Sequence, residues 1–369
     1  MRGTRARKHP NSSLILVAYY RFRDAVPPLR VLDGNRKKQA PSDLNEHTER
    51  TMNIPIVDIK PLFENDPQGW RNVEEALLAA HSTIGFSVLV NHGVPAAVIQ
   101  NLFDASARFH ELPLDQKMAL RYGANLRGYV PLNTSKLIRS TLGAARKPNH
   151  SESFMIVDEL DESLDQRWSQ SAVGGNQLWP REIDGFEAAA KAYRDALCKL
   201  GSATIRCFSS MMGRPRDGLD RYFAQPNAIL RLLRYPALPD RDADVFGSAP
   251  HTDYGCLTFV AQDNVGGLQV QSTDGRWFDV PTIENAFVLN TGQMMAAWSR
   301  GRIKATPHRV VNPTAKSRYS LAFFFNCSLD TPIDLSERQQ GDDPAQALRN
   351  RTYGEHLETL LRANYSFSA

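Results

Sequence analysis

Two histidines and an aspartate in the second half of the chain have the types and spacing of a metal site. His251 and Asp253 are two residues apart, so on an extended strand both side chains point to the same face. His308 comes 55 positions after Asp253 and would supply a second imidazole from another strand. Three such ligands would occupy one face of a metal ion and leave the opposite positions open. This ligand set with open positions is typical of non-haem Fe(II) sites that activate oxygen.

Arg318 and Ser320 form a second pair on one strand face, by the same two-residue spacing. A guanidinium can donate to both oxygens of a carboxylate, and a hydroxyl can add a third hydrogen bond. The apolar run from Leu321 to Phe325 is typical of a buried strand. We expect His308 on the neighbouring strand, so that a dicarboxylate could chelate the metal with one end and reach Arg318 with the other.

The composition is that of a globular protein with a large core: of 369 residues, 42% are hydrophobic and 23% are charged. Residues 1–51 hold 11 Lys/Arg and 5 Asp/Glu, which leaves 33 basic and 35 acidic residues in 52–369. This balance gives no electrostatic reason to bind nucleic acid. No apolar run reaches the roughly 18 residues that a membrane span needs. The four cysteines lack C-x-x-C spacing, which favours free thiols in a reducing compartment, so we expect a cytoplasmic protein.

The first 51 residues differ in character from the rest. Their arginine-rich, acid-poor start resembles an organelle transit peptide. Met52, however, stands immediately before the first convincing strand. We therefore interpret 1–51 as a disordered or non-native extension and expect Met52 to be the natural start. Residues 52–369 would form a single domain with three parts: a mostly helical N-terminal region (52–225), a β-rich core (226–330) and a C-terminal helix (331–369).

The apolar pattern changes its period along the chain. Helical spacing predicts helices over 68–82, from Pro95 onward, and over 186–212, the last apolar almost all round and therefore well buried. Strands are expected over 54–59 and 84–90, an irregular, functional loop region over 123–180, and a helix broken near Gly354 over 344–365. After the helix over 186–212 the apolar period changes to two. This period predicts strands over 228–235, 255–262, 267–272, 276–280, 286–291, 303–311 and 318–326. Short strands of this kind favour an antiparallel sandwich or barrel.

A series of motifs in fixed order carries a family resemblance. They are Ile54-Pro55-Ile56-Val57-Asp58, Asn91-His92-Gly93-Val94-Pro95, Arg127-Gly128-Tyr129, Arg234-Tyr235-Pro236, His251-Thr252-Asp253, Gly266-Gly267-Leu268-Gln269-Val270, His308-Arg309-Val310 and Arg318-Tyr319-Ser320. With these motifs the chain resembles the Fe(II)- and 2-oxoglutarate-dependent dioxygenase superfamily, in its isopenicillin N synthase-like branch, over nearly all of 53–366. The resemblance implies a mainly β fold with flanking helices, built on a double-stranded β-helix (jelly-roll) core.

The resemblance also implies roles for particular residues. His251, Asp253 and His308 would bind iron, and the distal carboxylate of 2-oxoglutarate would bind Arg318, Ser320 and Tyr235. Oxygen would be the oxidant, with ascorbate as an expected stimulant. The implied reaction is the oxidation, by default the hydroxylation, of an unactivated C–H bond of a small organic metabolite, as in secondary metabolism, with release of succinate and CO2.

One departure from the pattern leaves an alternative open. Leu233 stands two residues before Tyr235, where plant members usually have Asn. The Arg-Tyr-Pro sequence also occurs in isopenicillin N synthase itself. The alternative is therefore an Fe(II) oxidase of that kind, which performs ring closure or desaturation without 2-oxoglutarate.

Two further functions are weighed against an oxygenase. A zinc hydrolase also uses two histidines and one carboxylate, but it needs a general base, and no H-E-x-x-H motif is present. A non-catalytic jelly-roll binding protein would tolerate His308→Ala. For an enzyme, we expect substrate contacts from the last helix and from five residues of the loop-rich region: Arg127, Tyr129, His150, Ser153 and Phe154.

Overall fold

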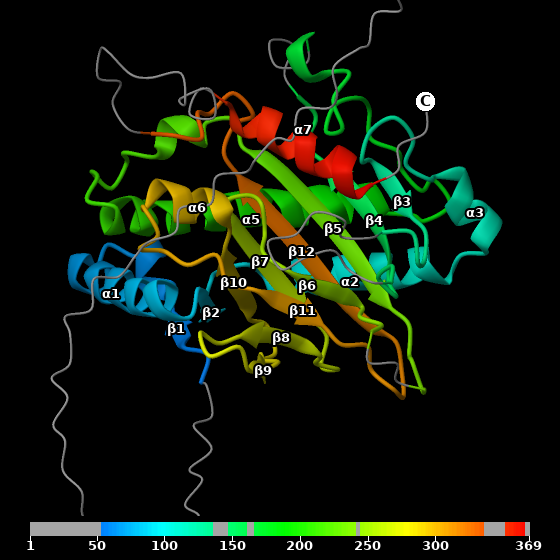
Figure 1. Cartoon of the computed structure of the whole chain (residues 1–369), viewed down its shortest axis with the longest axis horizontal. Coiled ribbons are helices and arrows are strands. Elements are labelled where there is room, and N and C mark those ends of the chain that lie inside the picture. The colour runs from blue at the N-terminus through cyan, green and yellow to red at the C-terminus, as the bar shows by residue number, and fades with distance from the viewer. Residues whose placement is uncertain (1–52, 136–146, 161–165, 241–243, 336–350, 366–369) are drawn as a thin grey trace, which may run out of the picture. The chain divides into compact units, whose positions relative to one another are not determined.

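The longest strands, β5 (Asn227–Tyr235) and β12 (Arg318–Asn326), lie at the centre of the fold in this computed structural model (Figure 1). They pair antiparallel along their whole length, from Arg318 opposite Tyr235 to Asn326 opposite Asn227. Side chains alternate along a strand, so each strand sends one set of residues to each face of the sheet. Both sets are largely buried, because helices cover one face and a second sheet covers the other.

The large sheet has the strand order β1-β2-β10-β7-β12-β5-β4-β3. Its neighbouring strands are antiparallel except β1 and β2, which run parallel. The strands besides β5 and β12 are β1 (Ile56–Asp58), β2 (Phe86–Val90), β3 (Gly128–Val130), β4 (Glu152–Val157), β7 (Leu257–Gln262) and β10 (Phe287–Thr291).

A smaller antiparallel sheet, in the order β6-β11-β8-β9, faces the large one. It consists of β6 (Ser248–His251), β8 (Leu268–Gln271), β9 (Trp277–Asp279) and β11 (His308–Val310). Val88, Leu233 and Val288 of the large sheet pack with Val270 and Val310 of the small one in a single buried cluster. Two facing antiparallel sheets around such a core confirm the predicted jelly roll with flanking helices.

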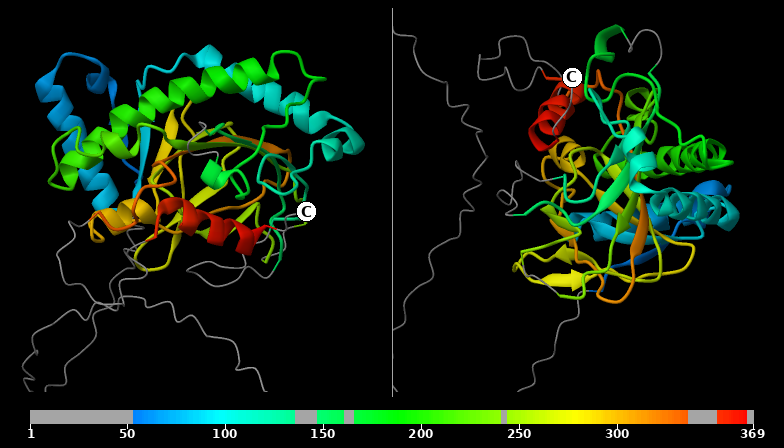
Figure 2. Two further views of the ribbon diagram at one scale, coloured as in Figure 1. Left: turned by 90° about the horizontal axis from the view of Figure 1, so that it is seen from above. Right: turned by 90° about the vertical axis from the view of Figure 1, so that its right-hand side faces the viewer.

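Helices cover the outer face of the large sheet. The helices α2 (Ala96–Glu111) and α5 (Phe186–Met211) contact β5 and β12, and α1 (Pro67–Thr83) packs against α5. Figure 2 shows α7 (Tyr353–Asn364) on the opposite side of the sheets from α2 and α5. Shorter helices are η1 (Lys60–Phe63), α3 (Leu114–Ala119), η2 (Asp220–Tyr222) and α6 (Gln293–Trp298).

The structure corrects several expectations from the sequence. The helix α5 is buried along one face only and exposes residues such as Lys191 on the other. The region expected to be irregular contains β3 and the fully buried β4. The strand β6, which ends at His251, is not among the strands predicted from the sequence. Gly354 lies within the first turn of α7, and the helix is not broken at this residue. The helix begins with a capping box between Thr352 and Glu355.

The structure describes residues 53–135, 147–160, 166–240, 244–335 and 351–365. They belong to one compact unit, Arg50–Ala369. The interpretation of residues 1–51 and of Met52 as the start falls outside the described residues. Within the described part of the chain, every helix is too short or too polar to cross a bilayer.

Candidate active site

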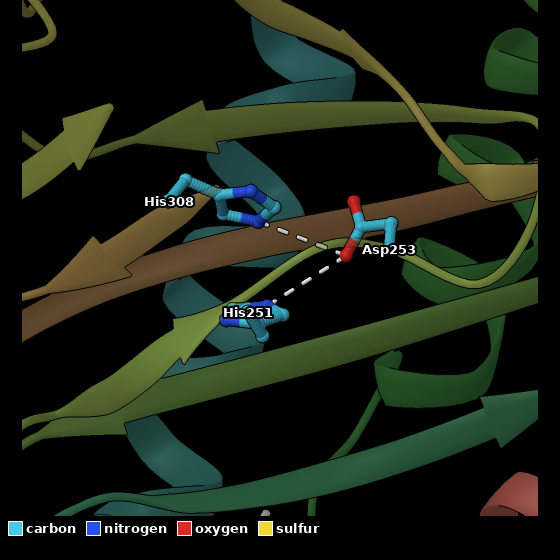
Figure 3. A group of neighbouring side chains, drawn as sticks. All are labelled: His251, Asp253 and His308. Carbon is cyan, nitrogen blue, oxygen red and sulfur yellow. Dashed lines mark ion pairs between the residues drawn. The ribbon is translucent and has the colours of Figure 1, made fainter. Parts of the chain in front are cut away.

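The three predicted metal ligands meet between the two sheets. Figure 3 shows the imidazoles of His251 and His308 directed toward the carboxylate of Asp253. Each Nε2 atom lies 3.7 Å from Asp253 Oδ1, and the two imidazole rings are 4.2 Å apart at their centres. One possible ligand atom from each residue lies within 4.8 Å of the others. Three atoms at this spacing can bind one metal ion between them.

Sheet pairing brings the two histidines together. His251 is the last residue of β6, and His308 is the first residue of β11, directly opposite it in the ladder. Asp253 follows two residues after the end of β6, so the turn after this strand aims its carboxylate back between the rings.

Backbone carbonyls fix which imidazole nitrogen faces the metal position. His251 Nδ1 lies 2.8 Å from the Ala249 carbonyl oxygen, and His308 Nδ1 lies 3.1 Å from that of Thr306. A carbonyl can only accept, so Nδ1 carries the proton in both rings and Nε2 keeps its lone pair. Both histidines therefore present an unprotonated Nε2 to the same point, as metal ligands do.

Asp253 is prepared as an ionised ligand. Its Oδ2 accepts hydrogen bonds from Thr258 Oγ1 and Asn290 Nδ2, each at 2.6 Å, which leaves Oδ1 free for a metal. Burial opposes ionisation, but the two imidazoles and these two hydrogen bonds outweigh it and hold the pKa of Asp253 below its usual range. Burial, and then repulsion from His308, lowers the pKa of His251 to about 4. The donor set is thus two imidazoles, each with Nε2 directed at the metal position, and an ionised carboxylate, which suits Fe(II).

Arg318 is a buried cation with unused donors. Its side chain is only 1% exposed and lies over the Tyr235 ring, with Cζ 4.8 Å from the ring centre. Nη2 donates to Gln262 Oε1 at 2.9 Å, but Nε and Nη1 have no acceptor among the described residues. A buried guanidinium with two unmet donors is costly unless a ligand satisfies it. Ser320, also 1% exposed, follows on the same strand face. Arg318, Ser320 and Tyr235 thus fit a carboxylate such as the distal one of 2-oxoglutarate.

The metal ligands and Arg318 come from different sheets. The sequence led us to expect His308 on the strand next to Arg318, but this expectation is wrong. The strand that carries Arg318, β12, pairs with β5 and β7. β11 belongs to the small sheet instead. The two groups therefore face each other across the interior of the jelly roll, and a dicarboxylate between them would bridge the two sheets.

A cavity of roughly 800 Å³, counted with its open mouth, reaches His251 and Asp253. Its wall combines apolar side chains with a few polar groups, as in sites for small organic ligands. The helix α7 forms one wall through Tyr353, Leu357 and Leu361. Its last residue, Asn364, donates from Nδ2 to the Tyr254 hydroxyl at 2.6 Å. Contacts from the last helix were expected, and the cavity wall agrees with that expectation.

The five loop-region residues expected at the substrate are not among those that line this cavity. Arg127 is buried and donates to the carbonyl oxygens of Val157, Asp158, Val173 and Gly174, so its guanidinium joins backbone segments. The same loop region lines the cavity through Leu126, Asn149 and Met155 instead.

The other four expected residues have different surroundings. Tyr129 donates to Glu152 Oε2 at 2.5 Å on the helix-covered side of the sheet, and Phe154 packs against the Phe109 and Phe186 rings. His150 Nδ1 lies 3.1 Å from Asn133 Oδ1. Ser153 Oγ accepts from Arg231 Nε at 3.0 Å, and Arg231 itself does line the cavity.

Three functional residues escaped the sequence reasoning. Thr258 and Asn290 hold Asp253, and Arg231 enters the cavity. A signal for Arg231 was present, because it lies four residues before Tyr235 and therefore on the same face of β5. Thr258 and Asn290 are buried polar residues within mainly apolar strands, and they are brought together by the pairing of β7 with β10, which the sequence does not show.

The fold and the site together define a non-haem Fe(II) oxygenase. The sequence model of the 2OG-Fe(II) oxygenase superfamily matches residues 226–326, which include the metal ligands and the Arg318 site. A second model, the N-terminal part of non-haem dioxygenases described for morphine synthesis, matches residues 54–182. The chain belongs to the 2OG-Fe(II) oxygenase superfamily and is an Fe(II)- and 2-oxoglutarate-dependent dioxygenase.

Named relatives agree with this assignment. The 2-oxoglutarate-dependent dioxygenase caaD of Aspergillus niger is 31% identical over 325 residues, which cover 86% of this chain and 94% of caaD. The corresponding enzyme citB of Monascus ruber is 32% identical over 300 residues, 78% of this chain and 89% of citB. A full-length Neurospora crassa protein, crystallised in complex with α-ketoglutarate, superposes with a TM-score of 0.71 at 29% identity, covering 84% of this chain and 96% of the Neurospora chain.

Proposed function

We propose that the protein hydroxylates an unactivated C–H bond of a small organic metabolite and releases succinate and CO2 from 2-oxoglutarate. One observation carries the proposal: the metal ligands open into a largely apolar cavity. Among the described residues that line it, Asp253 is the single carboxylate and His251 the single histidine. Both are assigned to the metal, so neither is available as the general base that hydrolysis needs. This argues for chemistry on a C–H bond and against a zinc hydrolase.

When bound, Fe(II) supplies the activation of oxygen. The protein's own residues position the reactants. His251, Asp253 and His308 hold the metal from one side, and Thr258 and Asn290 keep the Asp253 carboxylate ionised and oriented. The wall formed by α7 keeps water from the reacting C–H bond.

The unpaired donors of Arg318 favour a 2-oxoglutarate-dependent enzyme over an oxidase, which would take all its electrons from the substrate. An enzyme without this co-substrate would leave the Nε and Nη1 donors of Arg318 buried and unpaired, unless its substrate reached them. The distal carboxylate of 2-oxoglutarate would accept from both donors.

Relatives support a small-molecule substrate. Homoarginine-6-hydroxylase of Glycine max is 28% identical, and clavatol oxidase of Penicillium crustosum is 29% identical. The Neurospora crassa protein has also been crystallised with thymine, in a structure that matches at 28% identity. These relatives are named for, or bind, widely different molecules. They therefore support a small substrate and an oxidation reaction for this protein, but they do not identify the substrate.

The test is a panel of small metabolites incubated with Fe(II), ascorbate and oxygen, with and without 2-oxoglutarate. We expect at least one compound to raise succinate release and to gain one oxygen atom, as measured by mass spectrometry. A product that loses two hydrogens instead would replace hydroxylation by desaturation or ring closure. Oxygen consumption that is equal with and without 2-oxoglutarate would replace the proposal by the oxidase.

A further inference from the structure

Arg231 brings a positive charge into the substrate cavity. It lies in the middle of β5, is partly buried and lines the same cavity as His251 and Asp253. Its one hydrogen bond within the described structure runs from Nε to Ser153 Oγ at 3.0 Å. Ser153 is neutral and fully buried. Arg231 lines the cavity, and its terminal nitrogens form no hydrogen bond or ion pair with the described residues.

Arg231 lies in a different part of the jelly roll from the co-substrate site. Arg318 is paired with Tyr235 in the ladder, whereas Arg231 is paired with Ala322, four residues further along β12. Four residues of strand correspond to roughly 13 Å. The two arginines thus start from well-separated backbone positions, and Arg231 lines this cavity whereas Arg318 does not.

The charge of Arg231 stays uncompensated when the enzyme is loaded. The positive charges of Fe(II) and Arg318 are matched by Asp253 and the two carboxylates of 2-oxoglutarate. Arg231 is left as a single positive charge in a cavity whose other described walls are mostly apolar, including Met155, Phe324 and Leu357. A partly desolvated cation in such surroundings favours an anionic ligand.

We propose that Arg231 binds a carboxylate of the substrate, which makes the substrate class a mid-sized organic acid with an apolar body. The proposal rests on the proposed function and specifies its substrate. Ser153 is then a positioning residue, because it holds Nε and directs the terminal nitrogens of Arg231 into the cavity. The guanidinium would hold the acid group, while the apolar walls orient the carbon chain toward the metal.

The test uses matched pairs of acids and amides. The probes are 3-phenylpropionate, 4-phenylbutyrate, octanoate and decanoate, each with its primary amide. Binding to the enzyme loaded with Fe(II) and 2-oxoglutarate is measured by calorimetry without oxygen. We expect at least one acid to bind the wild type about ten- to a hundredfold more tightly than its amide, as for a charge-assisted pair.

Variants separate the role of Arg231 from that of the co-substrate site. Arg231→Gln removes the acid preference, Arg231→Lys retains part of it, and Ser153→Ala reduces it less than Arg231→Gln does. The affinity for 2-oxoglutarate changes by less than about threefold in all three variants, a shift below 1 kcal/mol. The control, Arg206→Gln on the exposed side of α5, leaves both affinities unchanged.

Three results would overturn the inference. They are a wild type that binds no acid more tightly than its amide, an Arg231→Gln variant that keeps the acid preference, and a loss of 2-oxoglutarate affinity in that variant as large as in Arg318→Gln. Failure of the proposed function looks different. In that case the wild type would release no succinate with any substrate, whatever the acid preference of its cavity.

Discussion

The strand β5 carries two arginines, Arg231 and Arg234, that point to opposite faces of the large sheet. On the helix-covered face, Arg234 Nη1 donates to Glu152 Oε1 at 2.7 Å. Glu152 also accepts from Lys117 Nζ at 2.8 Å and from the Tyr129 hydroxyl. On the interior face, Arg231 and Arg318 have no carboxylate partner in the described structure. On one face the charge of Arg234 is thus paired with a carboxylate of the chain, although its Nε has no acceptor among the described residues. On the other face neither arginine has a carboxylate partner there.

The difference separates structural charge from functional charge. Around Glu152 the chain supplies both the cations and the carboxylate, so these charges are paired when the protein folds. Around Arg318 and Arg231 the acceptors must come from outside, so the chain bears the cost of burying a cation until a ligand binds. Removing a residue from the first group should therefore cost stability, and removing one from the second should cost ligand binding.

The largest effect is expected at the metal itself. Asp253→Ala removes the one anionic ligand and should reduce iron binding and succinate release to background. Folding should be retained, because the substitution also removes a buried carboxylate. Iron content by atomic absorption, together with thermal unfolding, checks both parts. Retained stoichiometric iron in the variant would contradict the assignment of Asp253 as a ligand.

Arg318→Met tests the interior cation. We expect about a hundredfold weaker binding of 2-oxoglutarate, since two charge-assisted hydrogen bonds are lost, with the stability of the ligand-free protein unchanged or raised. Thermal unfolding with and without 2-oxoglutarate measures both quantities, because a ligand raises the melting temperature only of a protein that binds it. A variant that is destabilised but binds 2-oxoglutarate normally would reverse the assignment of the two faces.

Glu152→Gln is the matched test on the other face. It leaves Lys117 and Arg234 without a counter-charge, and we expect the free energy of unfolding to fall by about 3 kcal/mol. The affinity for 2-oxoglutarate in the folded protein should stay at its wild-type value. Urea unfolding and calorimetry provide the two measurements. Unchanged stability would show that this network is not structural.

A smaller effect is expected for Asn290→Ala, which removes one hydrogen bond from Asp253 Oδ2. Partners that orient a metal ligand typically contribute 10- to 100-fold in metal affinity or activity, so we expect a loss of about tenfold in iron affinity. Thr258 still holds the carboxylate in this variant. Iron titration measures the loss, and Asn290→Asp serves as a comparison that adds a competing charge.

The smallest effect concerns pH. Burial lowers the pKa of His110, next to the Glu152 network, to about 4 from 6.5. In the unfolded chain His110 binds a proton near pH 6.5, whereas in the folded protein it stays neutral until the pH approaches 4. The free energy of unfolding therefore falls as the pH drops from 6.5 toward 4. Glu152 has a pKa held below 4.5, mainly by Lys117 and Tyr129 against the effect of burial, and it adds a further loss at lower pH.

Urea unfolding of His110→Leu across this range tests the prediction. Its slope of stability against pH should be smaller than that of the wild type but not zero, because His81 is also buried, with a pKa lowered to about 3. Equal slopes in the two proteins would contradict the assignment to His110.

Much of the fold could be predicted from the sequence, because most strands are short, mainly apolar runs between turn residues and most helices have one apolar stripe. The strand β4 was missed for a physical reason. It begins with the polar residues Glu152 and Ser153, and only four apolar residues follow, so the sequence does not separate it from the surrounding Gly, Pro and Asn residues. The strand β6 is four residues long and contains Pro250, which is also a poor strand signal.

The candidate site was predictable where function depends on local spacing. Two pairs of site residues are each two positions apart, His251 with Asp253 and Arg318 with Ser320. This spacing can be read directly from the sequence. Contacts that depend on sheet order were out of reach. The chain crosses from the small sheet to the large one between Val310 and Arg318, which separates His308 from the strand next to Arg318. For the same reason the sequence could indicate Ser153 as a residue near the site, but it could not predict the hydrogen bond that Ser153 accepts from Arg231.

The helix α7 supplies part of the cavity wall but no metal ligand. Its inner side chains can therefore vary in size and polarity without altering how iron is held, which lets one catalytic centre serve different molecules. The hydrogen bond from Asn364 to Tyr254, the neighbour of Asp253, sets a limit to this freedom. A substitution that moves the end of this helix would therefore also affect the residue beside the carboxylate, so the shape of the cavity and the position of a metal ligand are linked through this hydrogen bond.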